Sequence, residues 1–126
     1  MSYCDGFCDV SVLEGKVLSN CYQNGSGEIV FETTDNQQFV MFHDQDCCES
    51  VNVEDICGEF EDLIGSPILR AEEITGTTPD EFNPEEYESY TWTFYKIDTA
   101  RGGVTIRWFG ESNGYHSESV SFKEVT

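Results

Sequence analysis

The densest set of side chains able to do chemistry lies in one run of seven residues. It reads His43-Asp44-Gln45-Asp46-Cys47-Cys48-Glu49, and every side chain except that of Gln45 is of a type that binds metal ions. A mixed histidine and cysteine set suits zinc, whereas a carboxylate set suits calcium or magnesium. The run has neither the Cys-x-x-Cys pair of a zinc finger nor the glycine and glutamate positions of an EF-hand loop. A metal site on His43, Asp44, Asp46, Cys47, Cys48 and Glu49 is therefore one of several hypotheses.

Two structural interpretations compete with the metal site. In one, His43 and the cysteine pair pack at the end of a strand while the carboxylates are solvated. In the other, Asp44, Asp46 and Glu49 accept backbone N–H hydrogen bonds and shape a turn. A catalytic thiolate–imidazole pair would need an electropositive environment, which the surrounding acids oppose. We therefore expect no enzymatic activity, and we expect the six cysteines to be free thiols or metal ligands.

Acidity dominates the composition, because 25 acidic and 6 basic side chains give a formal charge of -19. So few cations exclude nucleic-acid binding by phosphate neutralisation, and anionic membranes would repel the protein. Since such charge opposes compaction, it either adapts the protein to a halophilic or acidic niche or serves recognition. With 38% hydrophobic and 13% aromatic residues, the chain still has enough apolar material for one folded domain over residues 1–126.

The acids are concentrated in the middle of the chain. Residues 44–90 hold 15 of the 25 acids and a single base, whereas residues 91–126 hold four acids and four bases. A folded array of carboxylates can imitate the negative charge of a nucleic-acid duplex. The residues that we predict to bind a partner are the acids Glu54, Asp55, Glu59, Glu61, Asp62, Glu72, Glu73, Asp80, Glu81, Glu85, Glu86 and Glu88.

The elements that position these residues follow from the hydrophobic pattern. Period-two alternation predicts strands at residues 16–22, 28–33, 38–43, 67–74, 90–97, 104–109 and 119–123. Turn signals at 24–27, 35–36 and 102–103 indicate antiparallel hairpins. Helical spacing over residues 53–64, interrupted by Gly58, predicts one or two short helical turns. The predicted fold class is α+β, mostly an antiparallel meander of about six to seven strands with those helical turns in the middle.

The remaining segments carry fewer signals. Residues 1–9 are predicted to be a loose leader and residues 75–89 an exposed acidic loop. Because the N-terminus has no basic or apolar region and no apolar run approaches about 18 residues, we expect no signal peptide, no membrane span and a cytoplasmic location. The aromatic side chains of Trp92, Phe94, Tyr95, Trp108 and Phe109 are assigned mainly to the core.

Several segments resemble a family of small bacteriophage and prophage proteins that is catalogued as a domain of unknown function. The signature His-Asp-Gln-Asp-Cys-Cys-Glu-Ser-Val lies in the first of them, and the segments are residues 42–51, 54–56, 62–69, 71–73, 89–96, 105–110 and 112–115. The resemblance covers roughly residues 10–126, and it implies a phage origin and the cytoplasm of a host cell. It implies no reaction. Small acidic phage proteins are often inhibitors of host nucleic-acid machinery, which is an argument by association.

Together these observations predict a non-enzymatic phage accessory protein that binds and occludes a basic surface of a host protein. Nucleic-acid mimicry against a restriction or CRISPR-type defence, or against a nucleic-acid-processing factor, is one form of that inhibition. This hypothesis needs no cofactor and no direct contact with nucleic acid, and it predicts binding that weakens with salt. The alternative is a zinc- or calcium-binding domain centred on residues 43–49.

Overall fold

The computed structural model describes residues 8–43, 49–75, 89–112, 118 and 120–125, and the structural statements below concern these residues. They form eight strands and two short 3-10 turns. The elements are η1 (Val10–Leu13), β1 (Leu18–Gln23), β2 (Ile29–Thr33), β3 (Gln38–Phe42), β4 (Glu49–Cys57), η2 (Phe60–Leu63), β5 (Ile68–Thr75), β6 (Ser89–Thr99), β7 (Gly102–Ser112) and β8 (Ser121–Val125). The predicted, mostly antiparallel β structure is confirmed, and the helical content of this part of the chain is limited to the two 3-10 turns.

The first sheet has the strand order β1-β2-β3-β8, with every pair antiparallel. Its two hairpins use the turn residues that the sequence indicated. The Asn24 side chain accepts hydrogen bonds from the backbone N–H groups of Ser26 and Glu28, and Asn36 adopts a positive φ of 69°. The chain then leaves this sheet after β3 and returns to it only with β8, which pairs Phe122 with Met41.

The second sheet has the order β4-β7-β6-β5 and contains the two longest strands, β6 and β7. The turn of the β6–β7 hairpin lies at residues 100–101, so Gly102 and Gly103 are the first residues of β7 and not the turn that the sequence suggested. The expected C-terminal meander is also wrong in its last step, because β8 joins the first sheet instead of pairing beside β7. Strand pairing is favoured where it buries the apolar face of the strand. Pairing with β3 buries Phe122 of β8 in the core.

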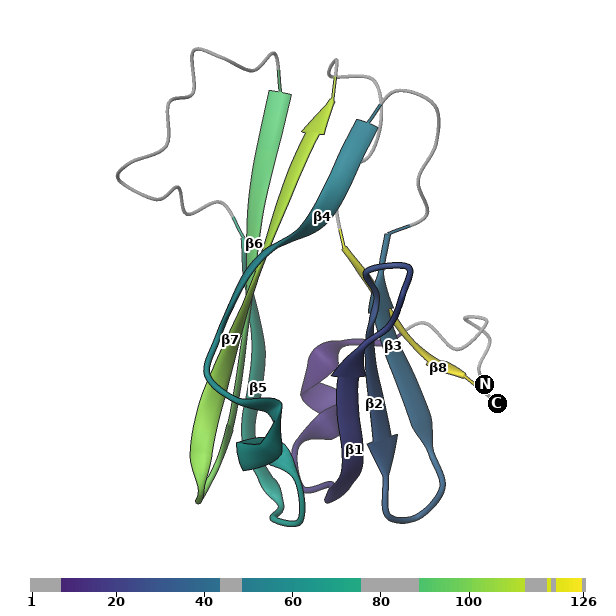
Figure 1. Ribbon diagram of the computed structural model, residues 1–126, viewed down its shortest axis with the longest axis vertical. Coiled ribbons are helices and arrows are strands. Elements are labelled where there is room, and N and C mark those ends of the chain that lie inside the picture. The colour runs from purple at the N-terminus through teal and green to yellow at the C-terminus, as the bar shows by residue number, and fades with distance from the viewer. Residues whose placement is uncertain (1–7, 44–48, 76–88, 113–117, 119, 126) are drawn as a thin grey trace.

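The two sheets pack face to face, and η1 fills the space between them at one end (Figure 1). Buried residues of both sheets form one hydrophobic cluster, in which Phe31 and Met41 of the first sheet and Tyr95, Ile106 and Trp108 of the second are at most 3% exposed. The Trp108 indole N–H donates a hydrogen bond of 3.2 Å to the Met41 Sδ atom, which links the sheets through the core. This arrangement is that of a β-sandwich.

Strand β4 replaces part of the helical segment that the sequence predicted. It is an edge strand that pairs with β7, and its register shifts between Val53 and Asp55, as at a β-bulge. The extra residue places Val53 and Ile56 on the same, inward side, although they are three positions apart. A spacing of three is also typical of a helix, so the bulge explains the wrong prediction. Only Phe60–Leu63 forms a helical turn in this region.

The aromatic residues of the second sheet divide between its two faces. Tyr95 and Trp108 belong to the core cluster, as predicted. Trp92 and Phe109 are cross-strand partners on the outer face, with ring centroids 4.6 Å apart, and Phe94 stacks beside Trp92. The Arg107 guanidinium lies 5.3 Å from the Trp92 ring. The assignment of Phe94 and Phe109 to the core is therefore wrong, because alternate residues of a strand point to opposite faces, whereas Trp92 is buried on the outer face at 7% exposure.

Two predicted segments lie largely outside the described residues. Of the leader at 1–9, the structure describes only Cys8, whose backbone N–H donates to the Phe122 carbonyl, and Asp9, whose side chain caps η1. Of the acidic loop at 75–89, it describes only Thr75 and Ser89, which are the end of β5 and the start of β6. In the part of the chain that is described, no helix is long and apolar enough to cross a membrane.

The end of β4 supplies a stability prediction. Gly58 has a φ of 107°, and a Cβ atom added to it would meet the Gly103 carbonyl oxygen at 2.5 Å. We expect Gly58→Ala to lower the free energy of unfolding by about 1–3 kcal/mol, because it adds both backbone strain and a backbone clash. Chemical denaturation measures this change.

The matched control for this substitution is Gly25→Ala. Gly25 has no positive φ, and nothing lies within 4 Å of its added Cβ atom. The control should leave stability within about 0.5 kcal/mol of the unsubstituted protein. Equal effects of the two substitutions would contradict the described close approach of the β4 end to β7.

Candidate functional site

The acids predicted to bind a partner are partly gathered along one edge of the second sheet. Glu54 and Asp55 are exposed residues of the edge strand β4. Both lie near the Arg107 guanidinium, with N···O distances of 2.6 Å to Glu54 and 4.0 Å to Asp55. Arg107 therefore balances part of their charge.

The three acids that follow lie at η2, just beyond the end of β4. Glu59 and Glu61 are exposed, and neither takes part in the ion pairs that the structure describes. Asp62 is half-buried beside the start of β7, where a Cβ atom on Gly102 would meet its Oδ2 atom at 2.9 Å. We call Glu54, Asp55, Glu59, Glu61 and Asp62 the acidic edge. Five carboxylates within nine residues and no base among them make it a strongly negative strip.

Glu72 and Glu73 do not join the acidic edge. They lie on β5, at the opposite side of the sheet, which is three strand spacings or about 14 Å away from β4. Glu72 forms an ion pair with Arg70 on the outer face. Glu73 is the cross-strand partner of the buried Tyr95, and partial burial raises the pKa of its carboxyl. The other predicted partner-binding acids, Asp80, Glu81, Glu85, Glu86 and Glu88, lie outside the described residues.

Of the predicted metal ligands, the structure brings together the first and the last. His43 follows β3 in the first sheet and Glu49 begins β4 in the second, and the His43 Nε2 and Glu49 Oε2 atoms are 2.8 Å apart. Their side chains are 6% and 2% exposed, so this contact is a buried link between the sheets. Asp44, Asp46, Cys47 and Cys48 lie outside the described residues. Among the residues that are described, no three histidine, cysteine or acidic side chains are grouped so that they could hold a metal ion.

Two of the three described cysteines, Cys21 and Cys57, are not set up as nucleophiles. Burial raises the pKa of the Cys21 thiol to about 12. Cys57 is exposed, but its thiol donates to the Asp55 carboxylate at 3.4 Å, and this hydrogen bond and the charge of Asp55 raise its pKa. Because the thiolate is the reactive form, neither environment favours thiol chemistry at neutral pH.

A carboxylate that the sequence did not single out accepts hydrogen bonds from two hydroxyl groups. Glu118 is 9% exposed, and it accepts hydrogen bonds from the Thr91 hydroxyl at 2.7 Å and the Ser112 hydroxyl at 2.5 Å. Burial alone would raise the pKa of this carboxyl, but the hydroxyl groups of Ser112, Ser89 and Thr91 lower it below its usual value. No local pattern marks Glu118, because its partners come from two strands that pair only in the folded protein.

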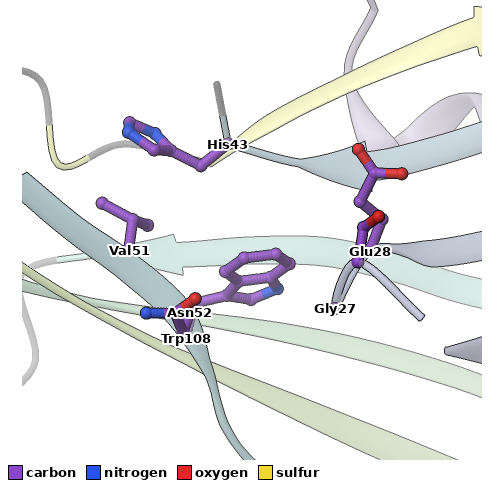
Figure 2. Close-up of a pocket in the computed structure, with 7 residues that line it drawn as sticks. Gly27, Glu28, His43, Val51, Asn52 and Trp108 are labelled. Atoms are coloured by element: carbon purple, nitrogen blue, oxygen red, sulfur yellow. The ribbon is translucent and has the colours of Figure 1, made fainter. Parts of the chain in front are cut away.

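A small cleft opens between the two sheets, and His43 is one of the residues that line it. It has a volume of about 200 Å³ and is lined by Ser26, Gly27, Glu28, His43, Val51, Asn52 and Trp108. In Figure 2 the Trp108 indole lies between the strand that carries Val51 and Asn52 and the turn at Gly27 and Glu28. No pattern in the sequence indicates this cleft, since its walls come from four separate segments.

Comparison with known proteins identifies one family. A family model described as a Domain of unknown function (DUF7448) matches residues 11–122, which include strands of both sheets. No curated protein and no solved structure matches the chain.

The hydroxyl groups of Ser112, Ser89 and Thr91, which we call the hydroxyl cage, stabilise the Glu118 carboxylate. Replacing this carboxylate should therefore change the stability of the protein by an amount that depends on pH. The folded-state pKa of Glu118 is lowered, so the ionised carboxylate stabilises the folded protein. This contribution to stability is complete above the unfolded pKa of about 4.3 and is lost as the pH falls through the folded-state pKa. We expect Glu118→Gln to cost on the order of 1–3 kcal/mol at pH 7. The difference between the two proteins should shrink below about pH 4, as measured by denaturation at a series of pH values.

Glu111→Gln is the control for this measurement. It removes the same charge near the same end of β7, but from a half-exposed carboxyl for which the structure describes no such cage. It should change stability by less than about 0.5 kcal/mol at any pH tested. A Glu118→Gln penalty that stayed constant from neutral to strongly acidic pH would contradict the assigned role of the carboxylate.

Proposed function

The chain belongs to the DUF7448 family of unknown function, and we propose that it is a non-enzymatic phage accessory protein that binds and occludes a basic surface of a host protein. The observation that carries this proposal is the acidic edge. Glu54 and Asp55 lie on the exposed edge strand β4, and Glu59 and Glu61 are exposed at the η2 turn that follows it, where a cationic surface can approach them. Carboxylates whose backbone belongs to a strand and a hydrogen-bonded turn keep a defined spacing, so they can be recognised by shape as well as by charge.

The contacts of the few Lys and Arg side chains support the proposal that the remaining negative charge binds a cationic partner. All six Lys and Arg side chains belong to described residues. Arg70 and Arg107 bind the acids Glu72, Asp98, Glu54 and Asp55, and Lys16 and Arg101 donate to the uncharged acceptors Gln37 and the Ile64 carbonyl. These four cations thus make contacts within the fold, and with 25 acids against six bases most carboxylates have no basic counterpart. Since uncompensated charge disfavours compaction, a cationic partner would relieve a cost that the free protein bears.

We propose nucleic-acid mimicry as the form of this occlusion. A partner that normally binds a duplex presents Lys and Arg side chains in a groove, and a strip of carboxylates can occupy the same groove. The proposed location is the cytoplasm of the host cell, and the proposed interaction needs neither a cofactor nor direct contact with nucleic acid. Association would be accelerated by long-range attraction and weakened by salt, because exposed charges are screened over about 10 Å at 0.1 M salt.

Neutralising two residues of the acidic edge tests this function. A basic, nucleic-acid-binding protein would be recovered from bacterial lysate on the immobilised chain, and its affinity measured over a range of salt concentrations. Glu59→Gln with Glu61→Gln removes two exposed carboxylates and should weaken binding roughly 2- to 30-fold at low salt, at about 0.2–1 kcal/mol for each pair lost. Duplex DNA should compete for the same partner.

The matched control is the double substitution Glu32→Gln with Glu124→Gln. It removes the same two charges from β2 and β8 of the other sheet. Any loss of binding in this control therefore measures the effect of net charge without the effect of position. Binding to the control should stay within about twofold of the unsubstituted protein. Equal losses in the two double variants, or an affinity that is indifferent to salt, would remove the acidic edge from the proposal.

A second candidate function is metal binding at residues 43–49, and the buried His43–Glu49 contact favours it. This contact joins the two ends of the run, so the segment between them starts and finishes at one point of the sandwich. Asp44, Asp46, Cys47 and Cys48 could then supply the further ligands of a zinc or calcium ion. Because ligands must be held by the folded chain, such an ion would also stabilise it.

Elemental analysis separates this candidate from the first. Protein purified without chelator should contain about one zinc or calcium ion per chain, EDTA should lower its melting temperature, and Cys47→Ser with Cys48→Ser should remove both effects. Substoichiometric metal together with a melting temperature indifferent to EDTA would exclude the metal site. The substitution pair leaves the buried His43–Glu49 contact in place, so it separates loss of metal from loss of that contact.

A further inference from the structure

A groove lies on the outer face of the second sheet. It has a volume of about 460 Å³, and the residues that form its walls are Cys57 of β4, Thr105 of β7, Phe94 and Lys96 of β6, and Ile74 of β5. The strand register brings them together, because Thr105 is the cross-strand partner of both Cys57 and Lys96, and neighbouring Phe94 is that of Ile74. All four strands of the sheet therefore contribute to the groove.

The walls of this groove are accessible and mostly apolar. All of the wall residues are half-buried except Cys57, which is exposed, so each is partly open to solvent. The Phe94 ring stacks beside the Trp92 ring, with their centroids 6.5 Å apart, and this contact supports it from one side. A volume of about 460 Å³ lies within the roughly 300–1,000 Å³ of small-molecule sites. The groove can thus hold an apolar body of small-molecule size.

Lys96 is the charged residue of the walls. Among the described residues, its side chain takes part in no ion pair, hydrogen bond or ring contact, whereas each of the other five basic side chains makes at least one. Glu72 is the cross-strand partner of Lys96, but its carboxylate binds Arg70. A cation without a partner beside apolar walls favours an anionic group on an apolar ligand, because the ion pair that forms there is partly shielded from water.

The charge of -19 does not exclude an anion from this face of the sheet. Three of the six basic residues, Lys96, Arg70 and Arg107, share the face, and the two arginines pair with the acids of neighbouring strand positions. Repulsion from more distant acids is screened over about 10 Å at 0.1 M salt. A dianion would meet more of this repulsion than a monoanion, so a single negative charge fits best.

We propose that this groove binds a small apolar monocarboxylate, whose carboxylate contacts the Lys96 ammonium while its aliphatic or aromatic body packs against Phe94 and Ile74. This site goes beyond the proposed function and does not depend on it. A phosphate ester fits less well, because Lys96 is a single point charge and the walls supply no second cation. A basic side chain is opposed by Lys96 itself. Because the ion pair is partly open to water, we expect binding at millimolar concentrations.

A titration with 4-phenylbutyrate tests the groove. The readout is the methyl NMR resonances of Ile74 and Thr105, and the uncharged comparison is 4-phenylbutyramide, which has the same body and nearly the same shape. We expect saturable shifts of both residues at millimolar 4-phenylbutyrate. The affinity for the amide should be roughly two- to fivefold lower, since it cannot form the ion pair.

Lys96→Met is the variant that tests the charge, because it keeps an unbranched apolar side chain and removes the ammonium. It should lower the affinity for 4-phenylbutyrate to about that of the amide, and it should leave the affinity for the amide within about twofold. Lys123→Met is its control, since it removes one cation from β8 of the other sheet. The control should change neither affinity by more than about twofold.

Ile74→Ala is the variant that tests the apolar wall. Ile74 lines the groove, whereas Leu69 of the same strand is 65% exposed and does not line it. With Thr105 as the readout, Ile74→Ala should weaken the acid and the amide alike, by at least about threefold, and Leu69→Ala should weaken neither. Folding of each variant is checked by its dispersed NMR spectrum.

Three results would overturn the inference: equal affinities for the acid and the amide, a preference for the cation 4-phenylbutylamine, or no saturable shift with folded protein. Methyl shifts that depend on protein concentration without any probe would also overturn it, because they would assign the groove to a contact between two copies of the chain. None of these results bears on the acidic edge, since Glu59 and Glu61 are not among the residues that line the groove.

Discussion

Burial of the inner faces of the two sheets against each other is the interaction on which the rest of this structure depends. A chain with a charge of -19 repels itself when it folds, so apolar burial has to offset that repulsion as well as the loss of chain entropy. The core does so with closely packed residues of both sheets, among them Phe31, Tyr95 and Ile106, none of which is exposed. The contact from Trp108 to Met41 and the pair of His43 with Glu49 add polar links across the same gap.

This core decides where charge can reside. Among the described acids, Glu59 and Glu61 are exposed at the η2 turn, whereas the buried Glu118 is accommodated by the hydroxyl groups around it. The cations lie where they stabilise the fold, as Arg107 does between Trp92 and Glu54. The negative surface is therefore a consequence of the sandwich and is held by it, so its carboxylates keep fixed positions.

Most strands were predictable from the sequence, including β1 and β5, whose register shifts lie near their first residues, whereas β4 was not. The alternation of β2, β3, β6 and β7 indicated strands at the positions where the structure has them. In β4 the bulge after Val53 sets inward residues three positions apart, which produces the spacing of a helix. The metal-ligand run was visible in the sequence, but only the structure shows that His43 and Glu49 lie on different sheets and meet. Glu118 and the cleft left no signal, because each depends on residues that are distant in the chain.

By itself, the sequence determined that this protein is acidic, mostly β and folded around an aromatic-rich core, because composition and alternation depend only on neighbouring residues. The tertiary structure alone decided which strands share a sheet, and therefore that β8 pairs with β3 and β4 with β7. It also decided that Trp108 faces inward and Trp92 outward, and that Glu28 and Trp108 line one cleft. Pairing between distant strands is set by how well buried faces match, which is a property of the whole chain. For that reason the acids could be counted from the sequence, but the surface that they form could only be seen in the fold.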